Sequence, residues 1–141
     1  MGKLSQKIIE LRLATRRACM CEGGGGTKKN TLSLKTKVLF LIEKGYSAKD
    51  IISSLMIAKT NLALITTDLC SEGLITKTKS TIDRREINFA LTEEGYRFLS
   101  ERENAIEEEI GFYFGSEEEY NHAIDAISKA IAVLDGTDEE I

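Results

Sequence analysis

The stretch that decides the fold is residues 83–95, DRREINFALTEEG. From Glu86 to Leu91 polar and apolar side chains alternate, which is the two-residue period of a β-strand with one buried face. Thr92 is the expected N-cap of a following helix, whose first turn carries two glutamates that interact favourably with the helix dipole. We therefore predict a strand over 85–91 that leads directly into a long helix.

The residues before this stretch complete a hairpin and supply two helices. Residues 74–79 form a second candidate strand, and the polar segment 80–84 joins the two strands. Upstream, Ser47 is the expected N-cap of a short helix, which a turn of three or four residues around Met56 connects to a helix over 58–72. Two helices joined by so short a turn predict a helix-turn-helix, and a hairpin directly after it makes a winged helix.

Two amphipathic helices are expected near the ends of the chain, over 3–21 and 117–135, and another over 33–44 precedes the helix-turn-helix. Four glycines at 23–26 are typical of a flexible linker, because no Gly-Lys-Ser/Thr follows as a phosphate loop would need. The first and last helices are apolar on more than one face, and a monomer of this size would struggle to bury both. The alternative is that they pack on the winged helix of their own chain.

Composition and charge narrow the class of protein. With 141 residues, 42% of them hydrophobic and 30% charged, the chain suits one domain with an ordinary core. The net charge of −4 is uneven, since residues 1–32 carry +5, residues 33–100 carry +2 and residues 101–141 carry −11. The acidic last third can be a solvated helix surface, and the slightly basic middle permits DNA binding. No apolar run reaches the roughly 18 residues of a membrane span, and the N-terminus lacks a signal-peptide pattern, so we expect a cytoplasmic protein.

Residues 57–75 and 83–95 together resemble the MarR family of bacterial and archaeal regulators. The wing of that family reads Asp-Arg-Arg, then a short alternating strand, then Leu-Thr-x-x-Gly, and this sequence has each part. The stretch from Leu69 to Leu74 is similar to the family's Leu-x-x-x-Gly-Leu at the end of its recognition helix. The resemblance implies a homodimer in which the first and last helices of two chains interlock and leave two winged helices on one side.

The expected fold is therefore mainly α with a small β-hairpin wing. A winged helix-turn-helix over 33–100 is flanked by dimerisation helices within 1–32 and 101–141, and residues 1–141 form a single MarR-like domain.

The face of the 58–72 helix opposite the apolar row of Leu62, Ile65 and Leu69 supplies the expected base contacts, because recognition helices usually meet base edges near their start. Asn61 can bond an adenine edge, Ala63 and Leu64 can contact thymine methyl groups, and Lys59 is expected at a phosphate. The full set of expected contacts on this helix is Lys59, Thr60, Asn61, Ala63, Leu64 and Thr67.

This helix also departs from the family pattern. The position of Leu64 is often arginine in relatives, and Asp68 stands where a basic residue is usual. One lysine and no arginine weaken guanine readout, which favours an AT-rich site or a weak binder and leaves room for a role outside DNA binding.

The wing restores part of the positive charge through Lys77, Lys79, Arg84 and Arg85. The resemblance implies that a wing arginine enters the minor groove, held by a neighbouring acid. Asp83 with Arg85 fits that arrangement, Arg84 is the other candidate, and a narrow AT-rich groove attracts either. The alternative is a surface ion pair that only stiffens the hairpin.

Cys19 and Cys21 invite a metal or redox interpretation. Two cysteines one residue apart on a helix point about 200° apart and cannot easily share a metal ion, so no metal and no cofactor is predicted. Some members of the resembled family sense peroxide through a cysteine in the first helix, and Arg16 and Arg17 would favour the thiolate of Cys19. The alternative is an inert small apolar side chain.

The aromatic residues after the long helix are the candidates for an effector site. Phe112, Tyr113, Tyr120 and His122 can line a pocket for a small hydrophobic or phenolic effector, although aromatic residues at a helix junction are more often core. An enzyme is not expected, because the sequence has one histidine, no nucleophile elbow and no metal-ligand set.

We therefore predict a sequence-specific double-stranded DNA-binding transcriptional regulator, a repressor released from a pseudo-palindromic operator by a small ligand or thiol oxidation. The alternative is a winged-helix dimer that acts mainly through protein–protein interaction and binds DNA weakly. The sparse basic charge of the 58–72 helix favours the alternative, and the Asp-Arg-Arg wing favours the regulator.

Overall fold

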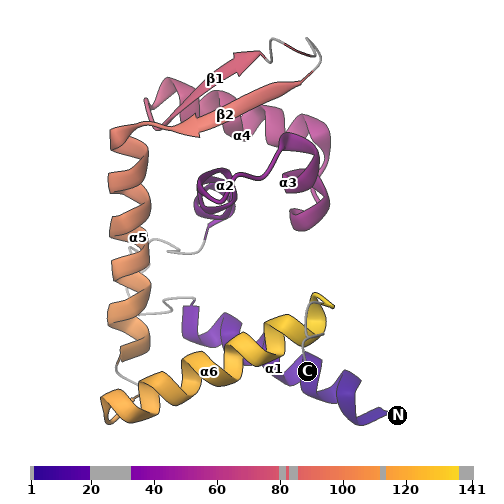
Figure 1. The fold of residues 1–141 in the computed structure, drawn as a ribbon, viewed down its shortest axis with the longest axis vertical. Helices are drawn as coiled ribbons and strands as arrows, with labels where there is room; N and C mark the ends of the chain where they lie inside the picture. Colours follow the sequence, from indigo (N-terminus) through magenta and orange to yellow (C-terminus); the bar gives the residue numbers. More distant parts are fainter. Residues whose placement is uncertain (1, 20–32, 80–81, 83–85, 112–113, 137–141) are drawn as a thin grey trace. The chain divides into compact units, whose positions relative to one another are not determined.

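Helices and one β-hairpin make up the part of the chain that the computed structural model describes, which is residues 2–19, 33–79, 82, 86–111 and 114–136. The elements in chain order (Figure 1) are α1 (Gly2–Cys19), α2 (Leu34–Glu43), α3 (Ala48–Leu55), α4 (Lys59–Ser71), β1 (Ile75–Lys79), β2 (Ile87–Leu91), α5 (Glu93–Gly111) and α6 (Glu117–Leu134). This order confirms the predicted winged helix between two outer helices.

Side-chain caps fix where the helices begin. The hydroxyl oxygens of Ser33 and Ser47 accept the backbone N–H of Thr36 at 3.2 Å and of Asp50 at 3.1 Å. Each bond satisfies an N–H that has no partner inside the first turn of a helix. At the other end of α2, Gly45 has a φ of 89°, a left-handed conformation that glycine adopts without strain.

The core lies where α2, α3 and α4 meet the hairpin and the first half of α5. α2 packs on α3 and on β2, while α4 packs on α3 and on β1, as Figure 1 shows for the upper part of the ribbon. The buried apolar side chains are Val38, Leu39, Ile42, Ile51, Leu62, Leu69, Leu74, Ile75 and Leu99. Their burial removes apolar surface from water and holds α4 on one side of the core.

β1 and β2 pair antiparallel, with Ile75 opposite Leu91 and Lys79 opposite Ile87. Side chains of β2 alternate between half-buried and exposed, which confirms the predicted alternation. The strand begins at Ile87, two residues later than predicted, and Glu86 lies outside the strand.

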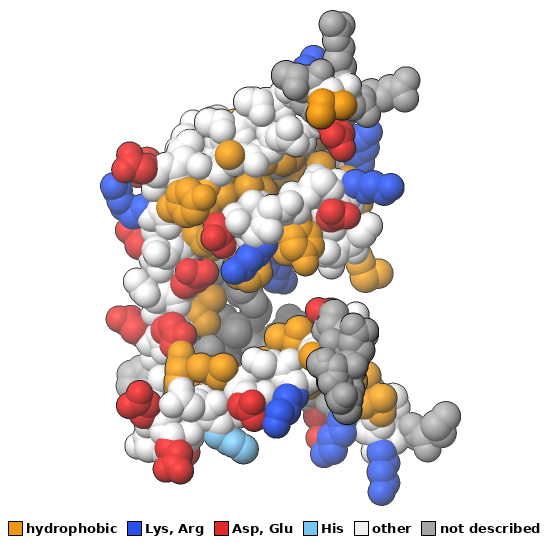
Figure 2. Space-filling view, in the orientation of Figure 1, with side chains coloured by type: hydrophobic (Ala, Val, Ile, Leu, Met, Phe, Trp, Pro, Cys, Tyr) orange, Lys and Arg blue, Asp and Glu red, His pale blue; other side chains and the backbone are white. Residues whose placement is uncertain are grey.

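The chain divides into two compact units, residues 1–106 and 107–141. In the second unit α6 has no buried residue, and Figure 2 shows orange hydrophobic side chains on its surface. The predicted single domain over 1–141 stays a prediction. Among the described residues, no helix is long and apolar enough to cross a bilayer, and no three His, Cys, Asp or Glu side chains are grouped as ligands for a metal ion.

Candidate nucleic-acid interface

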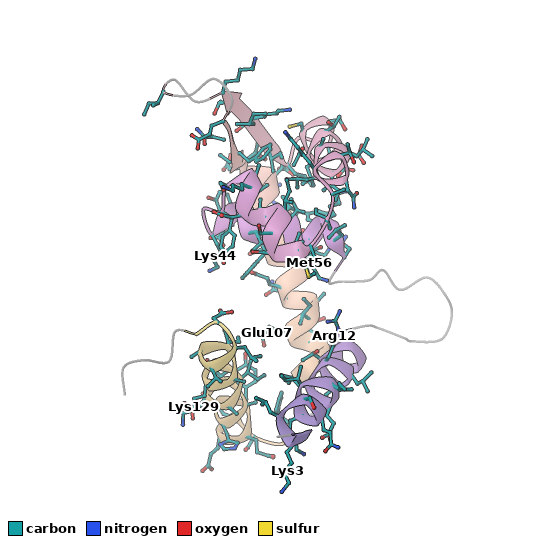
Figure 3. All side chains as sticks on the ribbon, turned by 90° about the vertical axis from the view of Figure 1, so that its right-hand side faces the viewer. Lys3, Arg12, Lys44, Met56, Glu107 and Lys129 are labelled. Atoms are coloured by element: carbon teal, nitrogen blue, oxygen red, sulfur yellow. The ribbon has the colours of Figure 1, made fainter. Side chains whose placement is uncertain are left out.

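The turn between α3 and α4 sets the geometry of the helix-turn-helix. Met56, labelled in Figure 3, ends α3 in a left-handed conformation with a φ of 55°. The backbone N–H groups of Met56 and Ile57 both donate to the carbonyl of Ile52, the latter at 3.3 Å. Ala58 is the N-cap of α4, so three residues, 56–58, connect the helices, within the predicted length.

α4 has one buried and one exposed face. Leu62, Thr66 and Leu69 are buried against the core. The opposite face consists of Thr60, Ala63, Leu64, Thr67 and Ser71, all of them exposed. Because residues three and four apart share one side of a helix, these five form a continuous surface strip, which we call the α4 outer face. The sequence predicted most of this face as base contacts, and the structure leaves it open to solvent.

The α4 outer face carries no charged side chain. Lys59 is the one basic residue of α4 and precedes the face, while Asp68 lies beside it. The N-cap Ala58 makes no side-chain hydrogen bond, so no side chain caps the N–H groups of the first turn. Such groups are common partners of phosphate oxygens.

Two hydroxyl groups of the α4 outer face are bound to the helix itself. The hydroxyl of Thr67 donates to the carbonyl of Ala63 at 2.8 Å, and that of Ser71 donates to the carbonyl of Asp68 at 2.9 Å. These hydroxyl hydrogens are therefore not available to a base, and Thr67 is left with its methyl group and the acceptor lone pairs of its oxygen.

Two lysines of the wing, Lys77 and Lys79, lie on one face of the hairpin. Lys77 and Lys79 are exposed and stand opposite Phe89 and Ile87 in the register. Residues directly opposite one another in an antiparallel pair share a face of the sheet, so both lysines border the half-buried row of β2. Asp83, Arg84 and Arg85 lie outside the described residues, and their predicted contacts with a minor groove stay predictions.

The end of the wing is bound to the end of α4 through Thr92. Its N–H donates to the carbonyl of Leu74 at 3.0 Å, and its hydroxyl donates to the carbonyl of Gly73 at 2.6 Å. The same hydroxyl oxygen accepts the N–H of Gly95 at 3.0 Å, which confirms Thr92 as the N-cap of α5. One side chain therefore joins α4, the hairpin and α5.

Several solved structures are similar to this chain over most of its length, and one of them contains DNA. FabT of Streptococcus pneumoniae in complex with DNA matches with a TM-score of 0.63 and 20% identity, over 94% of this chain and 98% of that chain. A mutant of MarR from E. coli matches with a TM-score of 0.67 and 14% identity, over 93% and 98%. BpsR of Bordetella bronchiseptica matches with a TM-score of 0.61 and 21% identity, over 89% and 98%.

The chain has the MarR fold. No family model and no curated protein matches its sequence. In this fold the α3–α4 pair is the helix-turn-helix, with α4 as its second helix, and the β1–β2 hairpin is the wing, as the sequence resemblance implied.

A cavity of about 400 Å³ lies inside the winged helix of this MarR fold, between α2, α3 and α5. Its lining is mainly apolar and consists of Thr36, Lys37, Phe40, Leu41, Ser54, Leu55, Leu99, Glu103 and Ile106. The volume is in the range of small-molecule sites. The sequence did not predict this cavity, because its walls come from three elements that are far apart along the chain.

The predicted aromatic effector site is described only in part. Tyr120 packs edge-on against Phe114, with ring centroids 5.7 Å apart, and its hydroxyl donates to both carboxylate oxygens of Glu107 at 2.7 Å. This hydrogen bond to Glu107, followed by desolvation and the negative charge of Glu107, raises the pKa of Tyr120 above 10.0. His122 is exposed, two residues further along α6.

The other residues predicted for the effector site and for redox sensing lie wholly or partly outside the part of the chain that the structure describes. Phe112, Tyr113 and Cys21 are outside the described residues, as is the side chain of Cys19, although its backbone ends α1. The redox hypothesis for the two cysteines therefore stays a prediction. Cys70, on α4, is a free thiol that is partly buried.

Proposed function

We propose that this chain is a sequence-specific transcriptional regulator that binds double-stranded DNA in the cytoplasm and acts by binding rather than by catalysis. The observation that carries the proposal is the α4 outer face, an exposed strip on the second helix of a helix-turn-helix whose other face is held in the core. A helix presented in this way fits the major groove of B-DNA. Structures of FabT and of MarR, both similar in fold, contain DNA.

In the proposed complex α4 and the wing have different roles. The α4 outer face lies in the major groove, with Thr60, Asn61 and Leu64 nearest to the base edges. Lys59, Lys77 and Lys79 are exposed cations that suit phosphate oxygens, which set the position of the protein but do not read sequence. The predicted arginines of the wing tip, Arg84 and Arg85, would add minor-groove contacts.

We infer that the active form is a homodimer on a pseudo-palindromic operator. α1 exposes Leu4, Ile9 and Leu13, and α6 exposes a row that includes Ile127 and Ile131, each of them at least half exposed. So many exposed apolar side chains on two helices are unusual for a soluble monomer and mark an interaction surface. A second copy that covers them would place two α4 helices on one DNA duplex, one helical turn apart.

The cavity supports control by a small ligand. It is lined mainly by apolar side chains, with Lys37, Glu103 and two hydroxyl groups as the polar members. A small hydrophobic effector that entered it would separate α2, which holds the recognition helix through α3, from α5. In BpsR, which is similar in fold, 6-hydroxynicotinic acid regulates DNA binding. We propose that the chain is a repressor released by such a ligand, with oxidation of Cys19 or Cys21 as the other route.

The decisive test is a fluorescence anisotropy titration against the duplex upstream of the protein's own gene and a scrambled duplex, over a salt series. We expect tight binding to the first duplex only, with an affinity that falls steeply as salt rises because phosphate contacts release counterions. Equal and weak binding to both duplexes would contradict operator recognition and would favour a winged-helix dimer that acts through protein partners.

A further inference from the structure

The α4 outer face has an unusual chemistry for a surface that meets bases. Its central side chain is Leu64, which is 68% exposed, and the neighbouring Ala63 is exposed as well. Leu64 lies four residues after Thr60, and Thr67 lies seven residues after it, so all three side chains share one side of the helix. The centre of the strip is therefore made of methyl groups that are in contact with water.

Two of the three hydroxyl groups of this strip, those of Thr67 and Ser71, donate their hydrogens to the helix itself. Because the hydroxyl of Thr67 donates to the carbonyl of Ala63, its hydrogen cannot bond a base, and its methyl group remains beside Leu64. Asp68 lies about 40° from Leu64 around the helix, where its carboxylate would repel the N7 and O6 acceptors of guanine. Lys59 is about 140° away from Leu64, too far around α4 to bond the same base.

One group in the major groove matches such a surface. Among the four bases only thymine presents an apolar group there, the methyl group on C5, whereas the others present hydrogen-bond donors and acceptors alone. We propose that Leu64, with Ala63 and the methyl group of Thr67, recognises the C5-methyl group of one thymine in each half-site, and that it accepts 5-methylcytosine for the same reason. This inference rests on the proposed function and specifies which chemical group the recognition helix reads.

Base analogues test this directly, because uracil differs from thymine only in the missing methyl group. The operator is first selected from a random duplex pool with the full-length protein, and each thymine of both half-sites is then replaced by deoxyuridine in turn. We expect replacement of thymine by uracil to raise the Kd at one symmetric position of the operator. The increase should be about fourfold when one half-site is changed, the value for one buried methyl group, and about fifteenfold when both are changed. At that position, 5-methylcytosine should bind more tightly than cytosine.

Variants assign the effect to the proposed side chains. Leu64→Ala, at an exposed position, should fold normally and bind the thymine and uracil duplexes equally. Thr67→Val keeps the methyl group and replaces the hydroxyl by a second methyl group, so it should retain the preference for thymine. Lys129→Gln, an exposed lysine of α6 outside the α4 outer face, is the control and should also retain it.

The outcomes separate this inference from the proposed function. A selected operator that binds tightly but loses nothing at any uracil, or a thymine preference that survives in Leu64→Ala, overturns methyl recognition and leaves the regulator intact. Failure to enrich any sequence from the pool overturns the proposed function and this inference with it.

Discussion

At the scale of single residues, Gly95 shows why the helix after the wing needs glycine. A Cβ atom at position 95 would lie 2.0 Å from the carbonyl oxygen of Leu74 and 3.3 Å from the Cβ of Leu91. The first of these contacts is with backbone that already accepts the N–H of Thr92, so it has little room to move. The glycine of the Leu-Thr-x-x-Gly pattern therefore permits a close approach between the start of α5 and Leu74, which lies between α4 and β1.

Gly95→Ala should lower the free energy of unfolding by about 1–3 kcal/mol, the usual cost of forcing extra atoms into a packed site. Urea denaturation followed by circular dichroism measures it. Gly111→Ala is the matched control, because it lies in the same helix with nothing within 4 Å of the added Cβ. The control should be neutral or stabilising, by up to about 1 kcal/mol. A Gly95→Ala protein as stable as the control would show that α5 can shift at no cost.

Tyr120 provides a second test at this scale, because its hydrogen bond to Glu107 favours the protonated phenol and raises its pKa above 10.0. The tyrosinate absorbance that disappears in Tyr120→Phe should therefore have its midpoint above pH 10.0. Glu107→Gln removes the negative charge and should move this midpoint down.

The direction in which the free energy of unfolding changes with pH follows from proton binding by Tyr120. Above pH 10.0 the unfolded chain loses the Tyr120 proton while the folded chain keeps it. The stabilisation is therefore complete below that pH and is lost as the pH rises through the folded pKa. A midpoint that is the same with and without Glu107 would contradict the hydrogen bond.

At the scale of elements, the wing and α4 have different roles in the proposed complex with DNA. α4 offers an uncharged outer face, while β1 offers two exposed lysines on the face shared with Ile87 and Phe89. The end of α4 is held by an ion pair between Glu72 and Lys35 of α2, whose ammonium also lies 5.6 Å from the ring centroid of Phe98 on α5. Affinity should therefore depend on the hairpin and specificity on the helix.

Lys77→Gln and Lys79→Gln should each weaken binding to every duplex by a similar factor and reduce the log–log salt slope by about 1. Anisotropy titrations at several salt concentrations, with selected and scrambled duplexes, measure both quantities. Lys129→Gln, an exposed lysine of α6, is the control and should leave the slope unchanged. If the wing variants instead changed base preference and kept the slope, the two lysines would not be phosphate contacts.

At the scale of the whole molecule, α1 and α6 each expose apolar side chains that the single chain does not bury. Ile124, Ile127 and Ile131 of α6 are each about half exposed, and α6 contributes no residue to the core. A soluble chain rarely leaves such rows in water. The predicted homodimer would cover them.

Ile127→Asp should convert the dimer into a monomer, because a carboxylate buried in an apolar interface loses its hydration without gaining a partner. Sedimentation velocity measures the change, and DNA affinity should fall with it. Lys129→Asp places the same side chain about 200° around the helix and should leave the dimer intact. The change would break only an exposed ion pair with Asp125, which is worth little. A wild-type protein that sediments as a monomer would contradict the homodimer.

The sequence by itself determined the order of the elements and the faces of the helices. The alternation from Glu86 to Leu91, the caps Ser47 and Thr92 and the spacing of Leu62 and Leu69 are local signals, because hydrogen bonds and side-chain periodicity act between near neighbours in the chain. They were enough to predict the winged helix and the exposed side of α4.

Only the tertiary structure decided the features that depend on distant residues meeting. The cavity between α2, α3 and α5, the contact of Gly95 with Leu74 and the bond from Thr92 to Gly73 join segments that no local pattern relates. Local patterns relate residues that are near one another in the chain, whereas close packing decides which distant segments meet.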